Sequence, residues 1–67
     1  MDSDHPWKAG DPCQVLEDVP LTLVGQTGQL VRIVREHDGN RSRTRLIVRL
    51  DKHGELVTVR RGAVLPI

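Results

Sequence analysis

Apolar residues recur at every second position from Leu46 to Leu50, and this pattern, the clearest in the chain, predicts a strand over residues 43–51. In an extended strand every second side chain points to the same face. We therefore expect Leu46, Val48 and Leu50 to lie on the inner face of a strand. The outer face then takes the residues between and before them, which are Arg43, Arg45, Ile47 and Arg49.

Short strands separated by Gly and Pro account for the rest of the chain. Residues 12–18, with Cys13 and Val15 inward, are predicted as the first strand, residues 28–36 as the second and residues 55–60 as the fourth. Residues 51–54 predict a hairpin turn, because Gly54 can take a positive φ. Residues 19–24 are expected as a loop, residues 61–63 as a single 3₁₀ turn, and residues 65–67 as an edge strand that tolerates Pro66.

The second strand contains one irregularity. Strict alternation would place Arg32 on the same face as Leu30 and Val34, inside the protein. A β-bulge near residues 31–32 would allow Leu30 and Ile33, and Val34 as a further candidate, to share the core. Arg32 and Arg35 would then reach water.

The composition agrees with an all-β domain. Val and Ile supply twelve of the hydrophobic residues and Ala only two, which favours strands over helices. We expect residues 7–67 to form one small, strongly bent five-stranded sheet, a partly open barrel, since closure removes exposed strand edges. Residues 1–6 are acidic and polar and are expected to form a flexible tail.

Several classes of protein are not expected from this composition. The longest apolar runs have three residues, whereas a membrane-spanning helix needs about 20. Cys13 is the single cysteine, so we expect no disulfide and a reducing compartment such as the cytosol. His5, His37, His53 and Cys13 lack the spacing of zinc ligands, and neither serine has an adjacent base, so we expect no metal, no cofactor and no enzymatic activity.

Three segments resemble small barrels of the SH3-like class. Residues 7–13 look like the first strand of a Tudor domain, and residues 49–57 with 64–66 look like its end. Residues 24–33 are similar to the KOW motif of ribosomal and transcription-elongation proteins, and residues 46–52 resemble the third strand of the small photosystem I subunit that helps to dock ferredoxin. The resemblance implies an SH3-like barrel that acts as a binding module. A Tudor-type cage for methylated side chains is not expected, because it needs several aromatic rings and this chain has only Trp7.

Charge is distributed unevenly along the chain. Residues 1–31 carry one Lys against five acidic residues, whereas residues 32–67 carry nine Lys and Arg against four acidic residues. A convex face rich in guanidinium groups can bind carboxylates or phosphates in bidentate geometry. The candidate partner-binding residues are Arg32, Arg35, Arg43, Arg45, Arg49, Arg60 and Trp7, with Arg41 nearby.

Three interpretations of these arginines are open at this point. They can form a solvated face that keeps the sheet soluble, a docking surface for an acidic protein, or a nucleic-acid surface in the KOW manner. The lack of aromatic residues argues against single-stranded ligands, because base stacking usually anchors them, but duplex or structured RNA held by its phosphates meets no such objection. Trp7 is interpreted as a cap over the open end of the barrel, with an exposed partner anchor as the alternative.

Overall fold

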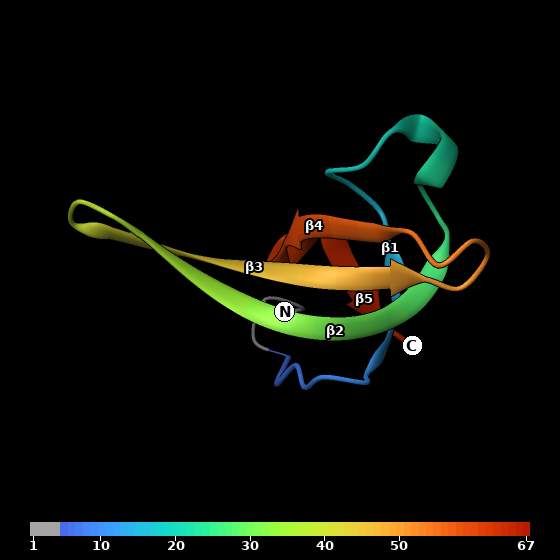
Figure 1. Ribbon diagram of the computed structural model, residues 1–67, viewed down its shortest axis with the longest axis horizontal. Helices are drawn as coiled ribbons and strands as arrows, with labels where there is room; N and C mark the ends of the chain where they lie inside the picture. The colour runs from blue at the N-terminus through green and yellow to red at the C-terminus, as the bar shows by residue number, and fades with distance from the viewer. Residues whose placement is uncertain (1–4) are drawn as a thin grey trace.

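Five antiparallel strands make one sheet in the computed structural model, which describes residues 5–67 (Figure 1). The strands are β1 (Pro12–Val15), β2 (Thr27–Asp38), β3 (Arg41–Leu50), β4 (Leu56–Arg60) and β5 (Val64–Pro66). They lie in the order β4-β3-β2-β1-β5, and the sheet does not close. The 3₁₀ turn η3 (Arg61–Ala63) precedes the last strand. The all-β prediction, with five strands and this turn, is confirmed.

The alternation in β3 builds the core, as predicted. Leu46, Val48 and Leu50 are each 0% exposed. They pack with buried side chains from the other strands, from η3 and from the segment before β1: Trp7, Cys13, Val15, Leu30, Val59, Ala63 and Val64. Within residues 5–67, ten buried hydrophobic residues thus form one core.

The bulge in β2 lies where the sequence predicts it. The register with β3 shifts between Leu30, which pairs with Val48, and Arg32, which pairs with Ile47. Arg32 therefore shares the outer face with Ile47 instead of entering the core. The prediction that Ile33 reaches the core is wrong, because it pairs with Leu46 but remains 40% exposed.

Ile33 is left exposed because β1 pairs only with residues 27–29 of β2, and farther along the two strands β2 and β3 form a long hairpin. Strands β2 and β3 are longer than predicted and continue together to a tight turn at residues 38–41, where Gly39 takes a φ of +62°. Strand β4 pairs only with residues 45–49 of β3, so residues 35–44 form a two-stranded arm that projects from the body (Figure 1). We call these residues the hairpin arm.

The first strand is shorter than predicted. It ends at Val15 instead of residue 18, because the backbone N–H groups of Leu16 and Glu17 donate to the carbonyl of Ala63 at 2.8 and 3.3 Å. The chain then reverses at Asp18, which has a φ of +65°. Within the expected loop, an additional short 3₁₀ turn, η2 (Leu21–Leu23), precedes β2.

The predicted tail of residues 1–6 falls mostly outside the described residues. Of its members, His5 and Pro6 are described. The carbonyl of His5 accepts hydrogen bonds from the backbone N–H of Trp7 at 2.9 Å and from the guanidinium of Arg61 at 3.0 Å. These two bonds join His5 to the domain.

Candidate binding cleft at the end of β4

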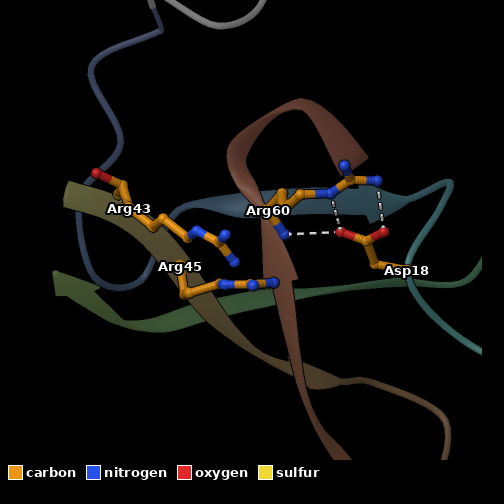
Figure 2. Close-up of a pocket in the computed structure, with 5 residues that line it drawn as sticks. Asp18, Arg43, Arg45 and Arg60 are labelled. Carbon is orange, nitrogen blue, oxygen red and sulfur yellow. Dashed lines mark hydrogen bonds and ion pairs between the residues drawn. The ribbon is translucent and has the colours of Figure 1, made fainter. Parts of the chain in front are cut away.

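Three of the predicted arginines surround one shallow, open cleft beside the last residue of β4. Arg45 and Arg60 are direct register partners on neighbouring strands, and Arg43 lies two residues from Arg45 on the same face of β3. The cleft has a volume of about 680 Å³ and is lined by Asp18, Arg43, Thr44, Arg45 and Arg60. Figure 2 shows the side chains of Arg43 and Arg45 extending toward the side where Arg60 and Asp18 lie. We call these five residues the arginine cleft.

Asp18 and Arg60 form a clamp at one wall of the cleft. The Arg60 guanidinium donates from Nε and Nη2 to the two carboxylate oxygens of Asp18, each at 2.8 Å, and the backbone N–H of Arg60 donates to Oδ2 at 3.0 Å (Figure 2). These hydrogen bonds from the Arg60 side chain and backbone lower the pKa of Asp18 to about 2. The same carboxylate raises the pKa of Arg60. Asp is one of the few residue types that tolerate a left-handed backbone, which allows the chain to reverse at this position.

The guanidinium groups of Arg43 and Arg45 make fewer interactions with the described residues than that of Arg60 does. Arg45, whose side chain is 27% exposed, forms an ion pair with Glu36, with 3.4 Å between Nε and Oε1. Arg43 has no ion pair with any residue in 5–67. Because an arginine has five N–H donors, all three guanidiniums keep donors that are free to meet a ligand.

This arrangement suits recognition of carboxylate or phosphate groups. Planar guanidiniums bind such groups through paired hydrogen bonds, and charge-assisted bonds of this kind are about twice as strong as neutral ones. The cleft is lined by three cations and one anion, so an incoming anion meets a net positive surface. It is shallow, and this shape fits a group on the surface of a macromolecule better than an enclosed small molecule.

The remaining predicted residues lie away from this cleft. Arg49 is flanked by Gln29 and Leu56, and Arg32 by Ile47, all on the outer face of the sheet. Arg35 and Arg41 lie on the hairpin arm. Arg35 pairs with Thr44 and so shares the opposite face from Arg43, and Arg41 pairs with Asp38 near the tip.

Trp7 lies in the core and is 7% exposed. Its ring contacts that of His5 edge-on, with 4.4 Å between the centroids. This burial fits the interpretation of Trp7 as a cap and leaves almost none of the ring exposed to a partner.

Sequence reasoning missed two residues that shape the cleft. Asp18 is separated from Arg60 by 42 positions, and no local pattern links them. Thr44 lines the cleft because β4 ends at Arg60, which pairs with Arg45, so Thr44 has no partner residue in β4. The sequence offered one signal for Thr44: the strand predicted at residues 43–51 is longer than its neighbour at residues 55–60, so one end of it must remain without a partner.

The chemistry of the other candidate groups is limited. Cys13 is 1% exposed, and burial is the main reason why the pKa of its thiol is raised, with Asp51 and Asp11 adding to the effect. A raised pKa and burial both make a thiol unreactive. Within residues 5–67, His, Cys, Asp and Glu side chains do not gather in groups of three or more that could hold a metal ion.

Comparison with protein-family models, curated proteins and solved structures finds no match to this chain. In the described part of the chain, no helix has the length and apolar character needed to cross a membrane.

Proposed function

We propose that this chain is a non-catalytic binding module that docks an acidic protein partner at the arginine cleft. The observation that carries the proposal is the convergence of Arg43, Arg45 and Arg60 on one open cleft at the end of β4, with Arg43 unpaired among residues 5–67. A cleft whose lining has a net positive charge concentrates acidic groups and speeds the encounter with an acidic partner.

We also propose that the fold is an SH3-like barrel. The strand order, the bent sheet and the 3₁₀ turn before the last strand are compatible with that class. The sequence resemblance to the ferredoxin-docking subunit of photosystem I supports a docking role, but a shared fold alone would not. A cytosolic setting is part of the same proposal, based on the single buried cysteine.

The burial of Trp7 makes a single-stranded nucleic acid an unfavourable ligand. Proteins that hold unpaired bases stack them on exposed aromatic rings, and the one aromatic ring of Phe, Tyr or Trp type here lies in the core. The arginines also stand among acidic side chains, with Asp18 on Arg60 and Glu36 on Arg45. These carboxylates weaken the positive field that a phosphate backbone requires.

The test is a titration of the ¹⁵N-labelled protein with a glutamate-rich peptide of about ten residues. We expect the largest amide shifts at Arg43, Arg45 and Arg60. Arg43→Glu should weaken binding by about tenfold or more, since a charge-assisted hydrogen bond contributes about 1.5–3 kcal/mol and each 1.4 kcal/mol is tenfold. Arg35→Glu is the matched control, because it makes the same change in net charge on the opposite face of the hairpin arm.

Equal weakening by the two variants would mean that only net charge matters and would remove the docking site. A labelled duplex RNA, titrated at several salt concentrations, tests the nucleic-acid alternative. Binding of the RNA with a steep salt slope, together with no binding of the peptide, would replace our proposal by the KOW-like function.

A further inference from the structure

One edge of β3 is open next to the arginine cleft. On one side, residues 41–44 pair with β2 from Arg35 to Asp38. On the other side β4 has already ended, because its last register pair joins Arg60 to Arg45. Within residues 5–67 no strand pairs with this second side of residues 41–44. Open strand edges are templates for pairing with another chain.

The backbone groups on this edge can be assigned from the hydrogen bonds at the other end of β3. The N–H of Leu50 donates to the carbonyl of Glu55 at 2.8 Å, and its carbonyl accepts from the N–H of Gly54 at 2.9 Å. Leu50 therefore directs both groups toward the β4 side. Successive residues of a strand alternate in this respect, so Ser42 and Thr44 direct their N–H and carbonyl groups to the same side, where β4 is missing.

The clamp at Arg60 agrees with this assignment. The N–H of Arg60 donates to the Asp18 carboxylate and not to β3, so Arg45 and Arg60 form a pair without mutual hydrogen bonds. Arg43 and Arg45 then direct their N–H groups to β2. The free backbone donors and acceptors at the open edge belong to Ser42 and Thr44.

The side chains at this edge determine which charge a pairing strand must carry. Arg41 and Arg43 project on the outer face of the hairpin arm, and Arg45 and Arg60 follow at the cleft. A second copy of this chain, pairing edge to edge, would bring these arginines against their equivalents, and like charges facing each other are unfavourable. A strand with acidic side chains at alternate positions would place carboxylates opposite Arg41 and Arg43.

We propose that the open edge of β3 binds an extended acidic segment of a partner protein as an additional strand. Backbone bonds from Ser42 and Thr44 hold the segment, and its alternate acidic side chains meet Arg41, Arg43 and the arginine cleft. This inference rests on the proposed docking function and specifies the form of the partner. It makes the hairpin arm the part of the fold that is completed by binding.

Amide hydrogen exchange of the protein with and without a peptide tests the backbone pairing. The probe has about ten residues, with Glu at alternate positions and Thr between them. We expect exchange at Ser42 and Thr44 to slow by about tenfold or more on saturation, because their N–H groups become hydrogen-bonded. Exchange at Arg43 and Arg45 should change much less, since their N–H groups already face β2. Unchanged exchange at Ser42 and Thr44 in the complex would overturn the proposal.

Two further comparisons separate backbone pairing from charge attraction alone. Two modified peptides carry N-methyl groups, one on its Thr residues and the other on its Glu residues. Each loses the backbone N–H donors on one edge of the peptide strand while its charge stays the same. One of the two should therefore bind at least about fivefold more weakly than the unmodified peptide. Thr44→Pro removes an N–H that faces the open edge and should weaken binding of the unmodified peptide similarly, while an amide NMR spectrum that keeps the native core resonances checks that this variant is folded.

The outcomes also distinguish this inference from the proposed function. If Arg43→Glu abolishes binding while both N-methylated peptides and Thr44→Pro bind normally, the arginine cleft docks acidic side chains without an added strand, and only this inference fails. If no acidic peptide binds the native protein, both fail. A duplex RNA that protects Ser42 and Thr44 when the peptide does not would assign the edge to a different class of partner and overturn the inference.

Discussion

Replacing Leu50 by Asp introduces a carboxylate at a core position that is 0% exposed. The loss of a fully buried leucine side chain costs about 1.5–3 kcal/mol. A carboxyl group left without partners must also be neutral, and protonating an ordinary Asp, with a pKa near 3.9, costs about 4 kcal/mol at pH 7. The two contributions together come to about 6 kcal/mol.

That loss is comparable to the whole stability of the domain. At about 0.05–0.15 kcal/mol per residue, a chain of 67 residues has an unfolding free energy of about 3–10 kcal/mol. Leu50→Asp should therefore be largely unfolded at pH 7, or should unfold at a small fraction of the native urea midpoint. The assay is far-ultraviolet circular dichroism during urea titration, with an amide NMR spectrum of each variant in buffer.

Leu56→Asp is the matched control. Leu56 is 60% exposed on the neighbouring strand and pairs with Arg49 on the outer face of the sheet. The same change of residue type should therefore alter the unfolding free energy by no more than about 0.5 kcal/mol. A Leu50→Asp protein with a native spectrum and the native urea midpoint would show that the inner face of β3 has been assigned incorrectly, and the outer arginine face would lose its basis.

Two other positions provide independent tests of the packing and of the clamp. A Cβ at Gly28 would overlap the carbonyl oxygen of Arg49, so Gly28→Ala should lower the unfolding free energy by about 1–3 kcal/mol in urea titrations. Gly62→Ala is the control, because a Cβ at Gly62 meets nothing within 4 Å. Equal stability of the two variants would contradict the close approach of β2 and β3. Arg60 lowers the pKa of Asp18 to about 2 from its ordinary 3.8, so the unfolded state binds a proton at Asp18 more readily than the folded state. The stabilisation by the clamp is therefore complete above about pH 4 and is lost as the pH falls toward 2. The melting temperature of Asp18→Asn should lie below that of the native protein at pH 6 and approach it near pH 2, and a difference that persists unchanged across this range would exclude the clamp.

The inner face of β3 and the bulge of β2 were predictable because both are local properties. Alternation of side chains along a strand needs no information from elsewhere in the chain, so Leu46, Val48 and Leu50 could be assigned to the core directly. Arg32 was equally informative, because a charged side chain that is out of phase with its strand must be returned to water, and a bulge does this within one residue.

The end of β1 and the exposure of Ile33 were not predictable in this way. The strand stops at Val15 because the following N–H groups bond to Ala63, which lies far along the chain. Ile33 is exposed because β1 pairs only with residues 27–29 of β2 and does not reach it, and the length of one strand relative to another is a property of the assembled sheet.

The candidate site divides along the same line. Amino-acid order alone determined that Arg43, Arg45 and Arg49 share the outer face of β3, since their spacing has the period of the pleat. Only the tertiary structure decided which arginines act together, because the ends of β4 and β1 bring Arg60 and Asp18 to one side of Arg45 and leave Arg49 elsewhere on the sheet. The physical reason is that side-chain direction follows from local backbone geometry, whereas the proximity of residues 42 positions apart depends on where strands end and how the sheet bends.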